Sequence, residues 1–265
     1  MRCVSRGAAG GGYSKVAVQA LIALIFLFFV TSAIGVVTGS NSLITVPVMF
    51  QFGIDEKVAV ATNMFGLTFM AIGATIPFLR SGKLEVKRLS PLIGVTLVGS
   101  ALGAALVGAI SGDGLKLIVS LAMIAIVLFT LLGPRRKFDE GSVGNWRLTA
   151  AGLAATFLLA IYGGLYSGGY VTVLTAAFVA FFGMSYGGAI AATKLVNVFS
   201  SGIATLVFMW QGLVDYKLGA VLGVTMFAGA YAGAYFVTKM NEAWLRGIFL
   251  ATVLLLAVKL IADLI

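Results

Sequence analysis

A lysine interrupts an otherwise apolar stretch of this sequence, AIAATKLVNVFSSG (189–202). A charged side chain within a membrane span is costly, and such residues usually serve binding or transport. All nine acidic residues fall in loops or at the ends of apolar segments, so none is placed to pair with Lys194. The ammonium group is therefore expected to bind a mobile anion. The alternative is that Lys194 extends its side chain toward the nearer membrane surface.

Two polar breaks would bring backbone groups to the same site. Residues 38–42 (Thr-Gly-Ser-Asn-Ser) and 166–169 (Tyr-Ser-Gly-Gly) each precede a short apolar segment, 43–53 and 170–183. Small polar residues and glycine interrupt helices and cap the next one. Two helix N-termini facing each other, with unpaired N–H groups and partial positive charge, would form an anion site. The alternative is that these small residues only allow close helix packing.

Further polar residues adjoin the lysine. Thr193 precedes it, and Asn197 follows it by three residues, roughly on the same helix face. The residues expected to bind the substrate are Thr38, Gly39, Ser40, Asn41, Ser42, Thr62, Asn63, Tyr166, Ser167, Gly168, Gly169, Thr193, Lys194 and Asn197.

Composition narrows the class of protein. Of 265 residues, 60% are apolar and 10% are charged, whereas soluble domains have about 25% charged residues. The chain has no histidine and one cysteine, Cys3, which excludes a His/Cys metal site and serine–histidine or cysteine–histidine catalysis. We expect an integral membrane protein that is not an enzyme and has no cofactor or metal. The net charge of +9 is explained by loop lysines and arginines, so no nucleic-acid partner is expected.

Ten apolar segments extend along the chain, and all but 43–53 and 170–183 are long enough to cross a membrane. They are 16–38, 43–53, 57–79, 89–111, 114–133, 147–166, 170–183, 187–210, 217–238 and 243–264. The sequence therefore predicts an all-α polytopic membrane protein with about eight transmembrane helices. We divide it into a cytoplasmic leader (1–15), a first repeat (16–133), a basic cytoplasmic linker (134–146) and a second repeat (147–265).

Loop charges predict the orientation, because lysine and arginine concentrate in cytoplasmic loops. Of the 18 basic residues, 13 fall on one side, four on the other, and Lys194 in the membrane, if residues 16–53 and 147–183 each make one net crossing. Lys217 is then cytoplasmic and Lys57 external. This scheme places both termini in the cytoplasm.

The two halves of the chain resemble each other, since residues 58–86 align with 188–216. The pairs include Thr62 with Thr193, Asn63 with Lys194 and Gly82 with Gly212, with a slip of one residue. The chain therefore reads as two four-span repeats of one pattern, each with a broken or re-entrant short helix. Four net crossings per half predict parallel repeats, related by an axis along the membrane normal.

The sequence also resembles the sulfite exporter TauE/SafE family over about 16–264. The resemblance rests on TGSNSLITVPVMFQFGIDEKVAVATNMFG, on RSGKLEV and on GGLYSGGYVTVLTAAFVAFFGMSYGGAIAATKLVNVFSSG. It implies an eight-span duplicated transporter associated with export or uptake of sulfite, sulfoacetate and other sulfur-containing anions. Many members have glycines where this chain has Ser40, Asn41 and Ser42, which bears on the choice of substrate.

The expected function is thus transport of a small anion across the cytoplasmic (inner) membrane, chiefly export. The expected partners are the anionic substrate and the lipid bilayer, and a homodimer is a further option. Without carboxylates in the span centres, a uniporter driven by the membrane potential is favoured over proton antiport, and sodium coupling stays open. The rival is a membrane-embedded assembly or accessory subunit that transports nothing; an intramembrane enzyme ranks third.

Overall fold

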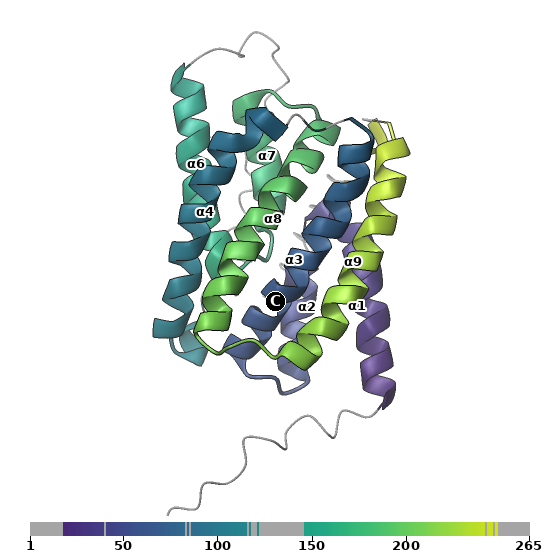
Figure 1. Cartoon of the computed structure of the whole chain (residues 1–265), viewed down its shortest axis with the longest axis vertical. Coiled ribbons are helices and arrows are strands. Elements are labelled where there is room, and N and C mark those ends of the chain that lie inside the picture. The colour runs from purple at the N-terminus through teal and green to yellow at the C-terminus, as the bar shows by residue number, and fades with distance from the viewer. Residues whose placement is uncertain are drawn as a thin grey trace, which may run out of the picture.

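The structure is a computed structural model that describes residues 18–39, 41–82, 84, 86–115, 117, 121, 146–241, 243–245, 247 and 248. Within these residues the chain forms helices and no strand, which confirms the all-α class (Figure 1). The helices are α1 (Val18–Thr38), α2 (Asn41–Gln51), α3 (Glu56–Arg80), α4 (Val86–Ala109), α6 (Trp146–Leu165), α7 (Tyr170–Phe182), α8 (Tyr186–Trp210) and α9 (Tyr216–Lys239).

Five of these helices, α3, α4, α6, α8 and α9, are long and apolar enough to cross a membrane. The helices α2 and α7 have 11 and 13 residues, or about 20 Å at most, and are too short to span about 30 Å of hydrocarbon. The segments 43–53 and 170–183 are therefore short helices, as predicted. Most of the expected spans 114–133 and 243–264 lies outside the described residues, so the count of eight spans stays a prediction, as do the repeat boundaries.

The same helices recur at a fixed spacing along the chain. The first and last residues of α8 (186 and 210) follow those of α3 (56 and 80) by one constant interval, and α9 follows α4 by the same interval (216 after 86, 239 after 109). The glycines with left-handed backbone conformations show the same spacing: Gly39 and Gly169, Gly53 and Gly183, Gly82 and Gly212. The turns and the lengths of these two pairs of long helices thus repeat together. We call this constant interval the repeat interval.

Contacts across helices fix their relative directions in the first group. Gly229 of α9 packs against Phe29 of α1, and Gly233 packs against Ala33, so α1 and α9 are parallel. Phe65 of α3 packs against Gly219 of α9, and Phe69 packs against Gly223, so α3 and α9 are also parallel. Since α1 and α3 run in the same direction, the short α2 between them runs back. Residues 18–53 therefore make no net crossing, and the predicted single crossing of 16–53 is wrong.

The second group repeats this arrangement. Gly99 of α4 packs against Phe157 of α6, and Gly103 against Ile161, so α4 and α6 are parallel. Ser100 of α4 bonds Ser200 of α8, and the carbonyl of Ala104, further along α4, accepts a bond from Gln211, just beyond α8. The helices α4 and α8 are therefore also parallel. Here α7 is the helix that runs back, so the predicted net crossing of 147–183 is also wrong.

The two groups point in opposite directions. Thr68 of α3 bonds Thr205 of α8 (3.1 Å), whereas Thr62, nearer the start of α3, accepts a bond from the main chain of Asp215, beyond the end of α8. The described helices of the two halves are therefore inverted, not parallel as predicted. Lys57 and Lys217 lie in the first turns of parallel helices at the same end, so their predicted placement on opposite sides is wrong.

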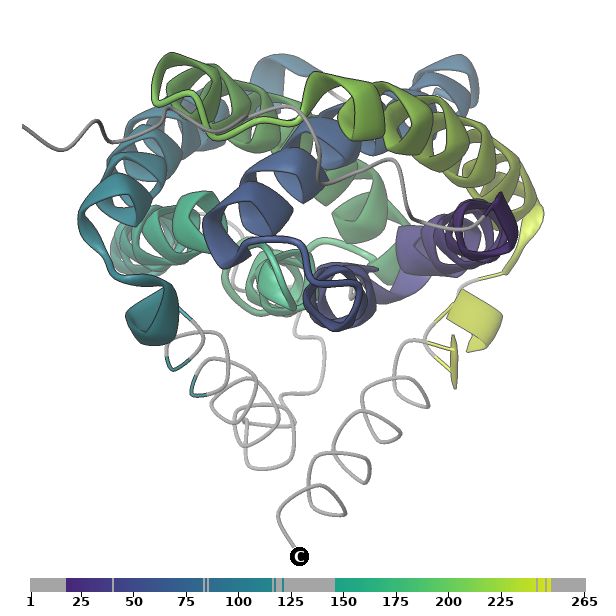
Figure 2. The same ribbon diagram turned by 90° about the horizontal axis from the view of Figure 1, so that it is seen from below.

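The halves are also intertwined. The first helix of each half packs mainly against a helix of the other half, α1 on α9 and α6 on α4. Seen from below, these pairs form the two sides of the molecule, and the short helices α2 and α7 lie between them (Figure 2). The two breaks that precede α2 and α7 are thereby brought to the centre.

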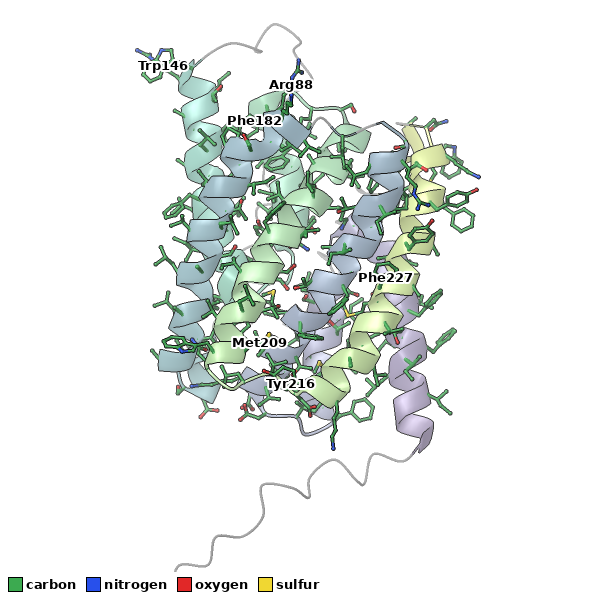
Figure 3. All side chains as sticks on the ribbon, in the orientation of Figure 1. Arg88, Trp146, Phe182, Met209, Tyr216 and Phe227 are labelled. Carbon is green, nitrogen blue, oxygen red and sulfur yellow. The ribbon has the colours of Figure 1, made fainter. Side chains whose placement is uncertain are left out.

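Apart from the buried Lys194, the described charged residues divide between the two ends of the helices. The end near Arg88 and Trp146, uppermost in Figure 3, has five basic residues and no acidic one among the described residues: Arg80, Lys87, Arg88, Arg147 and Lys239. The end near Tyr216, lowermost in Figure 3, has four acidic and two basic ones: Asp55, Glu56, Asp113, Asp215, Lys57 and Lys217. We call them the basic end and the acidic end.

Inversion of the halves predicts a specific labelling pattern. In a Cys3→Ser background, single cysteines at Lys57 and Lys217 should react with an impermeant thiol reagent from the same side of the membrane, and one at Ser81 from the opposite side. The measurement compares labelling of intact cells with labelling of inverted membrane vesicles. Labelling of Lys57→Cys and Lys217→Cys from opposite sides would restore the parallel arrangement.

Candidate functional site

The two helix breaks are joined directly by hydrogen bonds. The hydroxyl oxygens of Ser42 and Ser167 lie 2.7 Å apart, and the Tyr166 hydroxyl donates to the main-chain carbonyl of Ser42 (3.1 Å). The Thr172 hydroxyl, in the first turn of α7, donates to the carbonyl of Thr38 at the end of α1 (2.6 Å). The structure thus brings together the two segments that the sequence predicts to form the site.

Gly39 allows this close contact. Its φ is +70°, a left-handed conformation that side chains disfavour, and a Cβ atom there would lie 2.7 Å from the main-chain nitrogen of Thr172. The main chain of the first break therefore packs directly on the start of α7. Gly169 has the equivalent left-handed conformation immediately before α7.

Asn63 fastens α2 to α3. Its side-chain nitrogen donates to Ser42 (2.9 Å), and its side-chain oxygen accepts from Thr45 (2.7 Å). The matching bond in the second half joins Thr175 to Thr193 (3.2 Å), one repeat interval after Thr45 and Asn63. Asn63 therefore corresponds to Thr193, and the predicted pairing of Asn63 with Lys194 is wrong by one position.

Lys194 is inside the protein. Its side chain is 2% exposed, and its ammonium group donates to the carbonyl of Gly35 (2.9 Å), in the last turn of α1. The same carbonyl accepts the main-chain N–H of Gly39 (2.9 Å). The side chain does not extend to the surface, so the snorkelling interpretation is wrong. The cation lies at the end of α1 that carries partial negative charge, which stabilises it in part.

Asn41, the first residue of α2, packs against the same turn of α1. Its Cβ is 3.3 Å from the position that a Cβ of Gly35 would take. The side chain is 4% exposed, and neither its oxygen nor its nitrogen has a hydrogen-bond partner. A buried amide without partners costs free energy, so its oxygen and nitrogen are available to a ligand.

The other expected residues have mainly structural partners. Thr62 holds the main chain of Asp215. Thr193 also bonds the carbonyl of Ile190, and the carbonyl of Gly168 accepts from Tyr162. Asn197 is 5% exposed, and Ser40 lies outside the described residues.

The sequence analysis missed the threonines that link the breaks to their neighbours. Thr45, Thr172 and Thr175 each lie within a short apolar helix and bond across to another segment. A hydroxyl inside an apolar helix is a weak signal, because most such groups bond their own helix. Thr45 and Thr175 lie one repeat interval apart, and this shared position in both short helices is the feature that would have identified them; the position equivalent to Thr172 is Ser42.

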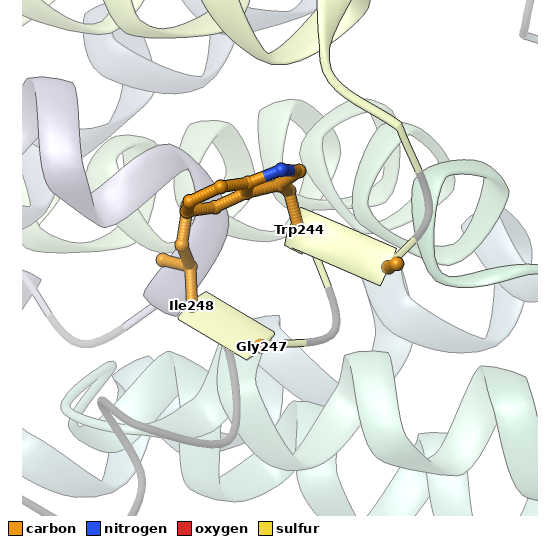
Figure 4. Close-up of a pocket in the computed structure, with 4 residues that line it drawn as sticks. Trp244, Gly247 and Ile248 are labelled. Carbon is orange, nitrogen blue, oxygen red and sulfur yellow. The ribbon is translucent and has the colours of Figure 1, made fainter.

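A pocket lies away from the breaks, beyond the end of α9. It is lined by Ala243, Trp244, Gly247 and Ile248 (Figure 4). These residues carry no charge, and the pocket includes none of the expected site residues. It is therefore not the candidate site.

The comparison with protein families decides the kind of protein that contains this site. The family model described as sulfite exporter TauE/SafE matches residues 7–260. The chain belongs to the sulfite exporter TauE/SafE family. It is therefore a membrane transporter, as the resemblance implied.

Curated relatives of this TauE/SafE protein agree. It is 30% identical over 246 residues to a "Probable membrane transporter protein ORF9" of Sinorhizobium sp, covering 91% of this chain and 93% of that one. It is 28% identical to "Probable membrane transporter protein YfcA" of Escherichia coli (strain K12), covering 91% and 89%. A third, YdhB of Bacillus subtilis (strain 168), is 23% identical, covering 88% and 96%. No solved structure matches the chain at a significant level.

The contact between the breaks of this TauE/SafE transporter can be tested at Gly39. Gly39→Ala should lower the free energy of unfolding by about 1–3 kcal/mol more than Gly82→Ala, because only the former adds a clash with α7. Gly82 is the matched control, with φ of +69° and no atom within 4 Å of its hypothetical Cβ, so both variants share the left-handed strain. Unfolding in detergent measures the difference, and equal losses in both variants would show that the breaks are not packed together.

Proposed function

We propose that this TauE/SafE transporter moves a small oxyanion, such as sulfite, sulfoacetate or another organosulfonate, across the cytoplasmic membrane. The anion binds where the two helix breaks meet, beside Lys194. The observation that carries the proposal is the buried ammonium of Lys194, which bonds a carbonyl and, among the described residues, has no buried carboxylate near it.

Electrostatics supports an anion at this position. A lysine at the centre of a membrane span costs about 2.5–3.5 kcal/mol on insertion scales. The carbonyl of Gly35 offsets only part of this, because the C-terminal end of a helix carries about half an elementary charge. Lys194 is the only charged side chain that is buried in the described part of the chain. A mobile anion would neutralise the part of the Lys194 charge that the end of α1 does not offset.

The arrangement of the helices also supports transport. In many secondary transporters, inverted repeats place discontinuous helices near the middle of the membrane, and the substrate binds at their broken ends. Here the breaks before α2 and α7 meet between the inverted groups, within hydrogen-bonding distance of each other. Movement of one group against the other would open the site to each side in turn.

The charge distribution supports one orientation. Five described basic residues at the basic end against two at the acidic end favour a cytoplasmic basic end. This agrees with the predicted cytoplasmic position of residues 80–88. The start of α1 then faces outward, so the expected cytoplasmic N-terminus does not fit the inverted arrangement. In the labelling experiment above, the Lys57 and Lys217 cysteines would react from outside.

The membrane potential, negative inside, would drive an uncoupled anion outward. This supports export as the direction of transport. The description of the family, sulfite exporter, supports a sulfur oxyanion as the substrate class.

Flux measurements on Lys194 variants test the proposal. Purified protein in liposomes should release trapped radiolabelled sulfite, and Lys194→Met should reduce the rate at least about tenfold by removing the charge that attracts the anion. Lys194→Arg should keep part of the flux, with altered selectivity among anions.

The matched control removes a buried polar group far from the breaks. Thr75 is 4% exposed and bonds only the carbonyl of Ala71 in its own helix, so Thr75→Val should transport like the wild type. Lys194→Met should be at least as stable as the wild type on thermal unfolding. Wild-type protein without any anion flux would support the accessory-subunit alternative, and normal flux in Lys194→Met would remove the lysine from the site.

A further inference from the structure

The buried amide of Asn41 distinguishes this site from a simple positive charge. Its oxygen can accept and its nitrogen can donate, yet neither has a partner although the side chain is 4% exposed. The polar groups described beside it at the first break are engaged: Ser42 with Ser167 and Asn63, and the carbonyl of Thr38 with Thr172. The unused hydrogen-bonding capacity of the described break is thus concentrated on one amide.

Asn41 and Lys194 converge on the last turn of α1. The ammonium of Lys194 lies 2.9 Å from the Gly35 oxygen, and the Cβ of Asn41 lies 3.3 Å from the position that a Cβ of the same glycine would take. An ammonium has three N–H donors, and one of them is used here, so the remaining two are available to a ligand. A ligand of a few atoms could contact both side chains at once.

We infer that the substrate is a monoanion that carries a hydroxyl, or a protonated oxygen, in addition to its charged oxygens. The inference rests on the proposed function and specifies its substrate. The charged oxygens bind Lys194, and the hydroxyl donates to the Asn41 oxygen. An anion with acceptors alone would leave that oxygen buried without a partner.

The single positive charge of the described interior predicts a substrate with a single negative charge. The described interior contains one cation and no carboxylate, so one negative charge neutralises it. A dianion would leave a net negative charge away from water, which is costly in a medium of low dielectric constant. A hydrogen-bearing oxyanion such as hydrogensulfite and a hydroxyalkylsulfonate both meet the two requirements, whereas sulfate and doubly ionised sulfoacetate meet neither, which narrows the proposed substrates.

The rival explanation is that the Asn41 oxygen only accepts a second N–H of Lys194 and so supports the lysine. In that case Asn41 would affect all anions alike. The inference predicts instead that Asn41 distinguishes between two anions of the same charge, shape and size that differ in one hydroxyl.

Hydroxymethanesulfonate and ethanesulfonate are such a pair, with a hydroxyl in one replacing a methyl in the other. Isothermal titration of the purified full-length protein in detergent should show hydroxymethanesulfonate binding about tenfold more tightly, the factor for one hydrogen bond of typical net strength. Sulfate should bind at least about tenfold more weakly than hydroxymethanesulfonate. In Asn41→Leu the affinity for hydroxymethanesulfonate should fall to that for ethanesulfonate, which should itself change less than about threefold.

Each result is decisive. Equal binding of the two sulfonates by the wild type, or an equal loss of both in Asn41→Leu, overturns the hydroxyl requirement while the anion site stands. Tighter binding of sulfate overturns the monoanion. Failure of both sulfonates to bind the wild type, or unchanged binding in Lys194→Met, contradicts the proposed function itself.

Folding of the variant is checked separately. Asn41→Leu removes a buried amide without partners, so its melting temperature without ligand should equal or exceed that of the wild type. If leucine does not fit beside Gly35 and Asn41→Leu fails to fold, binding of the same two sulfonates is measured with Asn41→Ala instead.

Discussion

A broken helix can exist inside a membrane only if the backbone groups that it frees find partners there, because lipid offers none. In this transporter each break is the main partner of the other. Ser42 meets Ser167, Tyr166 bonds the carbonyl of Ser42, and Thr172 bonds the carbonyl at the end of α1. This mutual satisfaction explains why the short helices lie at the centre and why Gly39 has no side chain where it contacts α7.

Two side chains where the breaks meet, Lys194 and Asn41, lack partners that fully match them. Lys194 brings a full charge to a carbonyl that carries only a partial one, and Asn41 brings an amide that bonds nothing. Asn41 belongs to the first break and Lys194 of α8 contacts the turn before it, whereas the position equivalent to Lys194 in the first half, one repeat interval earlier, is Met64. The near-symmetric scaffold thus contains an asymmetric polar site, and under the proposed function this asymmetry would give a small anion one orientation in which to bind.

The sequence predicted the parts of the fold that depend on local chemistry. The breaks, the short helices and the buried position of Lys194 all follow from which residues tolerate lipid and which interrupt helices. The direction of the second half could not be predicted in the same way, because counting loop charges does not distinguish a span from a segment that turns back, such as α1 followed by α2. The pairing of Asn63 with Lys194 failed because it rested on matching side chains, whereas the left-handed glycines carry the true spacing. Asn41 was expected in the site, but its missing partners are a property of packing alone.

The exchange of first helices between the halves has a consequence for biosynthesis. The residues of α9 that receive α1, Gly229 and Gly233, are made only after most of the chain that follows Phe29 and Ala33, their contacts in α1. At about 5–20 residues per second, α1 waits about 10–40 s for its partner. During that interval the nascent helix has only lipid, the insertion machinery or its own short neighbour to cover the face that α9 will occupy. The last helix of the described bundle to be synthesised is thus the one that fixes the first in place.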